Sequence, residues 1–90
     1  MIKERITNIL KRMTFEYFKV TEIDNNLPDM VEAEITNMIT KQKHYIYFPY
    51  DMLERWYGYQ NLKYNLVKEY ILNNISEDYY SLKEDVWSNK

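Results

Sequence analysis

The stretch MVEAEIT, Met30–Thr36, alternates strictly between apolar and polar side chains. A period of two predicts a β-strand with one buried and one exposed face. The members expected to point inward are Val31, Ala33 and Ile35. Those expected to point outward are Glu32, Glu34 and Thr36. One face of the predicted sheet therefore packs against the rest of the chain, and the other carries carboxylates.

Two further strands are predicted beside this one. Thr14–Ile23 is rich in aromatic and β-branched residues, which suit a pleated, half-buried surface. The stretch HYIYF, His44–Phe48, alternates again. Short turns at Asp24–Asp29 and near Lys41–Lys43 connect the three segments, so we expect an antiparallel meander.

The outer strands differ in how well the sequence fixes their inner face. In the last strand Ile46 and Phe48 are expected to point inward, which leaves Tyr45 and Tyr47 beside Glu32 and Glu34 on the outer face. In the first strand two choices compete for the core. These are Phe15 with Tyr17, and Phe18 with Val20.

Helices are predicted on both sides of the strands. Residues 1–13 carry apolar side chains at helical spacing, and residues 60–75 carry the clearest helical stripe. Between them, Pro49 suits the first turn of a helix that Gly58 is expected to end in the left-handed conformation. After Ser76 as N-cap, a last helix is expected over Glu77–Trp87. We therefore predict an α+β fold: one small domain, residues 1–90, with a three-stranded antiparallel sheet, helices on one face and the order α-β-β-β-α-α-α.

Composition bounds the class of protein. The chain has 90 residues, 46% of them apolar, and no cysteine, which leaves no disulfide or thiolate site. Lys3, Glu4 and Arg5 interrupt any signal peptide, and the longest apolar run, Tyr45–Tyr50, is far shorter than the ~20 residues of a membrane helix. We expect a soluble, cytoplasmic protein without membrane contact. Ile, Asn, Lys and Tyr supply 37 of the 90 residues, which is typical of an A/T-rich genome such as that of a low-GC bacterium or its phages.

The residue inventory argues against catalysis. His44 is the only histidine, and we expect it to face solvent. A single glycine leaves no loop to cradle a phosphate. The stretch DNNLPDMVEAEI, residues 24–35, lacks the glycine and the final glutamate of a calcium loop. We therefore expect no enzymatic activity, no cofactor and no metal.

Nucleic-acid binding is the main alternative function. The α-β-β-β-α order resembles the double-stranded RNA-binding domain, but the lysine cluster of that family is missing, since Lys63 stands alone in YQNLKYN. A basic first segment and Lys41 with Lys43 are the candidate contacts. The formal net charge of −2 argues against direct contact with nucleic acid.

An acidic block supports a different reading. Residues 14–40 carry one lysine and six carboxylates. Carboxylates along a sheet can imitate a phosphate backbone, and tyrosines are frequent anchors of protein interfaces. The candidate partner-binding residues are Glu16, Glu22, Glu32, Glu34, Tyr45 and Tyr47. An ordinary solvated face is the alternative interpretation of the same residues.

The layout of a helix, a three-stranded meander and further helices in a short acidic chain resembles small phage inhibitors of CRISPR nucleases. That resemblance implies a non-enzymatic phage or mobile-element protein that binds a larger host protein and inhibits or modulates it. A homo-oligomer remains a further alternative, in which a second surface formed by Tyr79, Tyr80 and Trp87 pairs with its own copy.

Overall fold

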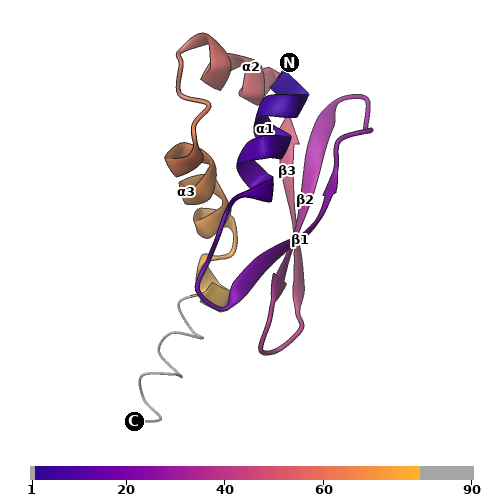
Figure 1. Cartoon of the computed structure of the whole chain (residues 1–90), viewed down its shortest axis with the longest axis vertical. Helices are drawn as coiled ribbons and strands as arrows, with labels where there is room; N and C mark the ends of the chain where they lie inside the picture. The colour runs from indigo at the N-terminus through magenta and orange to yellow at the C-terminus, as the bar shows by residue number, and fades with distance from the viewer. Residues whose placement is uncertain (1, 80–90) are drawn as a thin grey trace.

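The structure is a computed structural model, and it describes residues 2–79. Its elements are α1 (Ile2–Lys11), β1 (Phe18–Asp24), β2 (Met30–Asn37), β3 (Lys43–Pro49), α2 (Tyr50–Gly58) and α3 (Tyr64–Asn74) (Figure 1). Residues 76–79 are helical again and begin the last predicted helix. The predicted α+β order is confirmed. Most of Glu77–Trp87, with Tyr80 and Trp87, lies outside the described residues.

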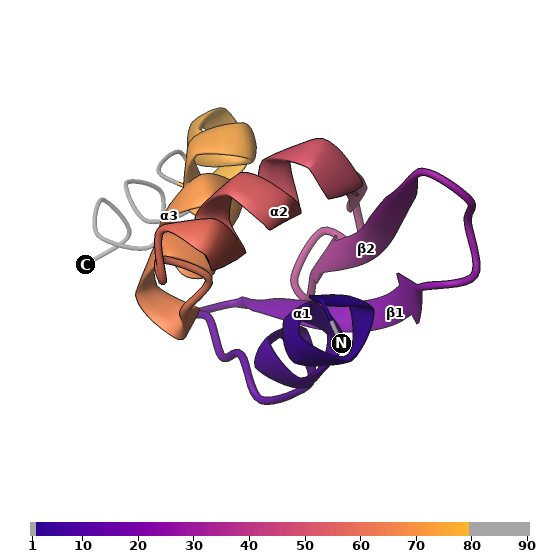
Figure 2. The same ribbon diagram turned by 90° about the horizontal axis from the view of Figure 1, so that it is seen from above.

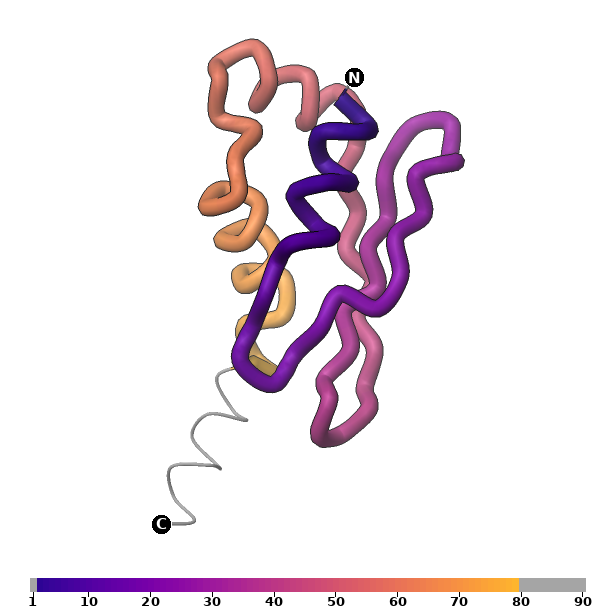
Figure 3. The backbone as a smooth tube through the Cα atoms, in the orientation of Figure 1, coloured from indigo at the N-terminus to yellow at the C-terminus, as the bar shows by residue number. Residues whose placement is uncertain are grey.

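The sheet has β2 at its centre, antiparallel to both neighbours. Its inner face is covered by helices (Figure 2), and α1 and α2 contact β1 and β3 respectively. The inward positions predicted for β2 are confirmed, because Val31, Ala33 and Ile35 are fully buried. The predicted exposure of the other face is wrong for Glu34 and Thr36, which are only 9% and 6% exposed. The two hairpin turns lie at opposite ends of the sheet (Figure 3). Thus each end of the outer face adjoins a different turn.

A β-bulge in β1 settles which side chains of this strand face the core. Val20 pairs with Ile35 and Glu22 pairs with Glu34, so Thr21 is an extra residue. The bulge shifts the alternation by one position. As a result Ile23, rather than Glu22, pairs with buried Ala33 and packs against the core.

The start of β1 differs from the prediction. The strand begins at Phe18 rather than Thr14. Tyr17 has a φ of 68°, in the left-handed region that interrupts an extended chain. Its carbonyl accepts a hydrogen bond from the Met38 amide at 2.8 Å, which fixes the kink against the β2–β3 turn.

The core lies between the sheet and the helices. Its buried members include Ile6, Ile9 and Leu10 of α1, Phe18 and Phe48 of the sheet, Leu53 of α2, and Val67 and Ile71 of α3. Trp56 is half-buried and makes an edge-on contact with Tyr70, with ring centroids 5.4 Å apart. The predicted inward orientation of Phe48 is therefore confirmed.

The end of α2 is built differently from the prediction. Gly58 is the last helical residue, and its φ is not positive. Gln60 instead has a φ of 59°. Its amide donates to the Tyr57 carbonyl at 3.0 Å, and the Asn61 amide donates to the Trp56 carbonyl at 2.7 Å. This is a Schellman motif with Gln60 at the left-handed position. Because residues 59–63 form this helix end and the next N-cap, α3 begins at Tyr64 and not at Gln60.

Within residues 2–79, no helix is both long enough and apolar enough to cross a membrane.

Candidate protein-binding face

The outer face of the sheet gathers carboxylates around two tyrosines. We call this surface the acidic sheet face. Its residues are Glu22 and Asp24 of β1, Glu32 and Glu34 of β2, and Tyr45 and Tyr47 of β3. The predicted outward orientation of the two tyrosines is confirmed, because Tyr45 is 49% and Tyr47 is 48% exposed.

Like charges oppose one another across the first two strands. Glu22 pairs directly with Glu34, and Asp24 pairs directly with Glu32. Carboxylates in such positions repel each other and destabilise a sheet. The bulge at Thr21 creates this register, because without the extra residue Glu22 would fall on the opposite face.

Glu34 is compensated within the sheet. Its Oε1 accepts a hydrogen bond from Thr21 Oγ1 at 2.6 Å, and Lys43 Nζ lies 3.7 Å from the same oxygen. The Thr21 hydrogen bond is the largest influence that holds the pKa of Glu34 below its ordinary value, and it outweighs the opposing desolvation; the Lys43 charge acts in the same direction. Glu34 has only 9% of its surface exposed, so it stabilises the structure of the acidic sheet face more than it contacts solvent.

The Asp24–Glu32 pair has no comparable compensation. Asp24 Oδ1 accepts a hydrogen bond from the backbone amide of Asn26 at 3.0 Å, which shapes the β1–β2 turn. In the described part of the chain, neither Asp24 nor Glu32 forms an ion pair with a lysine or arginine. A cation that binds beside them from outside the chain would therefore reduce the repulsion between these two carboxylates.

The carboxylates surround a small hollow. It has a volume of about 90 Å³, and its lining residues are Glu22, Asp24, Glu32, Glu34 and Tyr45. Small-molecule sites usually occupy about 300–1,000 Å³, so this hollow is too small for a typical substrate. Its size and charge fit the head group of one basic side chain. In residues 2–79, no group of three or more His, Asp or Glu side chains is arranged to hold a metal ion.

The tyrosines stand beside this hollow on the adjacent strand. Tyr45 pairs with Glu34, and Tyr47 pairs with Glu32. The Tyr70 hydroxyl donates a hydrogen bond to the Tyr47 carbonyl at 2.9 Å, which ties β3 to α3. The two rings are thus presented by a strand whose backbone is held on both sides.

The structure does not bring every predicted residue together. Glu16 lies in the connection before β1, outside the sheet, because Tyr17 interrupts the strand. Asp24, which sequence reasoning did not select, belongs to the acidic sheet face through its pairing with Glu32. The two-residue period could not reveal this, since the bulge resets the alternation of β1 between Val20 and Glu22.

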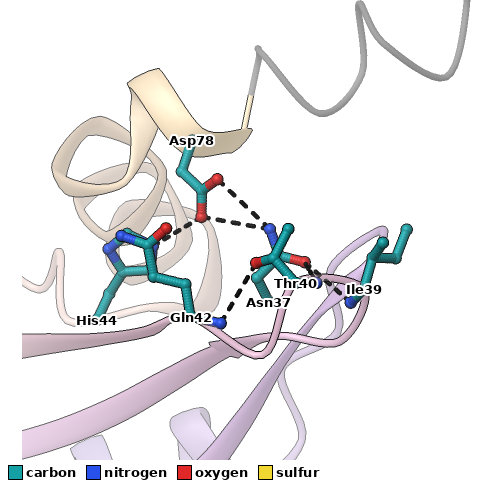
Figure 4. A network of polar contacts seen from close by, with 6 residues as sticks. All are labelled: Asn37, Ile39, Thr40, Gln42, His44 and Asp78. Carbon is teal, nitrogen blue, oxygen red and sulfur yellow. Dashed lines mark hydrogen bonds and ion pairs between the residues drawn. The ribbon is translucent and has the colours of Figure 1, made fainter.

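The prediction for His44 was wrong. His44 pairs with buried Ile35 and lies on the inner face, where its Nε2 is 2.8 Å from Asp78 Oδ2 (Figure 4). Asp78 also accepts hydrogen bonds from Asn37 Nδ2 at 3.3 and 3.4 Å. The Oδ1 of Asn37 accepts from the amides of Ile39 and Thr40. This network joins the β2–β3 turn to the segment after α3.

No hydroxyl hydrogen-bonds to the imidazole of His44 in the described part of the chain. The network therefore has the geometry of a structural clamp and lacks a nucleophile positioned beside the histidine.

No protein-family model matches the chain, and neither a curated protein nor a solved structure is significantly similar to it.

Proposed function

We propose that this protein is a small non-enzymatic binding module whose acidic sheet face occupies a basic surface of a larger host protein. The hollow between the two opposed carboxylate pairs supports this most strongly. A lysine or arginine head group entering the hollow relieves the repulsion that the register of β1 and β2 builds in. The partner thus supplies a positive charge that the Asp24–Glu32 pair lacks within residues 2–79.

The tyrosines add an independent argument. A cation held near Tyr45 can also lie against an aromatic ring, which contributes about 0.5–2 kcal/mol depending on desolvation. Tyrosines with half-exposed rings are common anchors of protein interfaces, since they bury large area with few rotatable bonds. Carboxylates and rings together favour a protein surface rich in arginine or lysine.

Such surfaces are typical of proteins that bind nucleic acid. We infer that the partner is a nucleic-acid-binding enzyme, and that occupation of its basic channel inhibits or modulates it. The resemblance in layout to phage inhibitors of CRISPR nucleases, together with the A/T-rich composition, supports an origin in a phage or mobile element.

A defined arginine-rich peptide tests the chemistry of the face. The variant Glu22→Lys/Glu32→Lys reverses two charges that make no internal hydrogen bond or ion pair within residues 2–79. The matched control is Glu54→Lys/Glu69→Lys, which reverses two exposed charges on α2 and α3. Glu34 is left intact because its hydrogen bond with Thr21 supports the fold.

In an NMR titration of the wild-type protein, the peptide is expected to shift the amides of β1, β2 and Tyr45 around the hollow. The face variant loses these shifts, and the control retains them. Equal binding by both variants would contradict the proposal, because the peptide would then respond only to net charge. A Tyr45→Leu/Tyr47→Leu variant, with unchanged charge, is expected to bind several-fold more weakly.

A further inference from the structure

A second surface has the opposite charge. A groove of about 590 Å³ lies between α1, the end of α2 and the start of α3. The basic residues in its wall are Arg5, Arg12 and Lys63, against one acid, Glu4. The exposed ring of Tyr57 and the half-buried ring of Tyr64 line it as well.

A second groove adjoins the first at Arg12. It also measures about 590 Å³ and runs along the connection from α1 to β1. Its charged residues are Lys11, Arg12 and Lys19, with no acid, and its rings are Phe15, Tyr17 and Phe18. Five basic residues and one acidic residue therefore line the two grooves of a chain whose net charge is −2.

The walls of these grooves are held in place. Arg5 donates from Nε to the Leu62 carbonyl at 3.0 Å, which fixes its guanidinium. The Tyr64 hydroxyl accepts the Thr14 amide at 3.1 Å, and Lys68 Nζ lies 5.3 Å from the centroid of the Phe15 ring. Tyr17 is kept in its left-handed conformation beside the second groove, and such strain persists only where the surroundings enforce it.

The cations are also available to a ligand. Within residues 2–79, the side chains of Arg12 and Lys63 form no hydrogen bond or ion pair. Arg5 lies in α1 and Arg12 directly follows its last residue, Lys11; the helical rise from Arg5 to Lys11 is about 9 Å at 1.5 Å per residue, so the two arginines can contact different phosphates. Arginine binds phosphate through a planar fork of donors, and exposed rings stack on bases without sequence preference.

We propose that the two grooves form a continuous site for single-stranded nucleic acid. Arg5, Arg12 and Lys63 contact the phosphates, and Tyr57 stacks on a base. A strand suits this surface better than a duplex, because unpaired bases are required for stacking on the rings. The net charge obscured this site in the sequence, since the acidic sheet face and the basic grooves cancel in the sum.

Anisotropy of a labelled short oligothymidylate tests the site with the full chain. The wild-type protein is expected to bind with a Kd of roughly 1–100 µM near physiological salt, the range of non-specific binding. Arg12→Gln/Lys63→Gln is expected to weaken binding at least about ten-fold and to lower the salt slope by roughly 1.4, since each phosphate contact in a single strand contributes about 0.7. Tyr57→Leu weakens binding without changing the slope.

The control is Arg55→Gln, which removes an exposed cation that lines neither groove. It is expected to retain wild-type affinity. Circular dichroism verifies that every variant is folded.

Absence of oligonucleotide binding would overturn the proposal, as would equal losses in the groove variant and the control. Binding of polyglutamate with the same affinity and the same dependence on Arg12 and Lys63 would also overturn it, in favour of an acidic protein partner. A duplex of the same length is expected to bind more weakly than the single strand.

Discussion

Thr21 Oγ1 lies 2.6 Å from Glu34 Oε1, and the residue that makes this contact is the one inserted by the bulge in β1. The same hydroxyl lies 2.7 Å from Thr36 Oγ1. One irregularity therefore sets the register of the carboxylates and also stabilises the most enclosed of them. The acidic sheet face depends on this residue more than on any single acid.

Replacing Thr21 with valine removes the hydroxyl and keeps the β-branched shape. The pKa of Glu34 is expected to rise toward its ordinary value, because the Thr21 hydrogen bond is the largest influence that lowers it. Lys43→Met is expected to give a smaller rise. An NMR titration of the glutamate side-chain carbons measures both. An unchanged Glu34 pKa in Thr21→Val would refute the assigned cause.

The same contact predicts a pH dependence of stability. Because the folded state holds the pKa of Glu34 below the unfolded value, the ionised carboxylate stabilises the fold above the unfolded pKa. This contribution is lost as the pH falls through the folded-state pKa. Urea unfolding at neutral and acidic pH should therefore show a smaller acid-side loss of stability in Glu34→Gln than in the wild type. Parallel curves would contradict the prediction.

The Asp24–Glu32 pair predicts a conflict between stability and binding. Glu32→Lys replaces a repulsive cross-strand pair with an attractive one, so the free energy of unfolding is expected to rise by about 0.2–1 kcal/mol. The gain should shrink in high salt, which screens exposed charges. Denaturant melts at low and high ionic strength measure it. A loss of stability at low salt would show that the two carboxylates do not repel each other.

The end of α2 predicts an increase in stability from two exposed residues. Gly58 lies within the helix, and a Cβ added there meets no atom within 4 Å, so Gly58→Ala should stabilise by about 0.5–1 kcal/mol. Gln60→Gly should also stabilise, because glycine takes the left-handed conformation without strain. Gly58→Ala and Gln60→Ala are measured as separate variants, which distinguishes the effect inside the helix from the effect at the left-handed position. Thermal unfolding checks both, and destabilisation by Gln60→Gly would contradict the helix end described above.

The hydrogen-bond network around Asn37 predicts a large loss of stability when its side chain is removed. Asn37 is fully buried and satisfies Asp78 and two amides of the β2–β3 turn. Asn37→Ala removes the acceptor of both amides and one of the two partners of Asp78, which keeps His44, and is expected to cost about 1–3 kcal/mol. The control Asn65→Ala, on the exposed side of α3, should change stability by no more than about 0.5 kcal/mol. Similar melting curves for the two variants would refute the clamp.

The sequence predicted the elements whose side chains alternate without interruption. The period of β2 assigned both of its faces, and that of β3 placed Tyr45 and Tyr47 outward. It could not place the bulge, because Thr21 and Glu22 read as ordinary strand residues until their partners on β2 are known. The bulge also hid the position of Asp24. Glu16 was expected within the strand, but the left-handed conformation of Tyr17 delays the start of β1 to Phe18.

His44 shows a different kind of error. Its position two residues before Ile46 already indicated the inner face, but a titratable side chain was expected in solvent. The compensating partner, Asp78, is 34 residues away and could not be predicted from local pattern. The sequence indicated the basic first segment, but it could not show that Lys63 and Tyr57 join this segment in one groove, because they lie about 50 residues further along the chain.

The most direct test of the protein-binding proposal is capture from a lysate of the native host, treated with nuclease, with quantitative mass spectrometry of the bound proteins. Three baits are compared: the wild type, Glu22→Lys/Glu32→Lys and Glu54→Lys/Glu69→Lys. We predict that one large basic protein is retained by the wild type and by the helix control and is lost from the face variant. The same proteins at the same levels on all three baits would contradict the proposal.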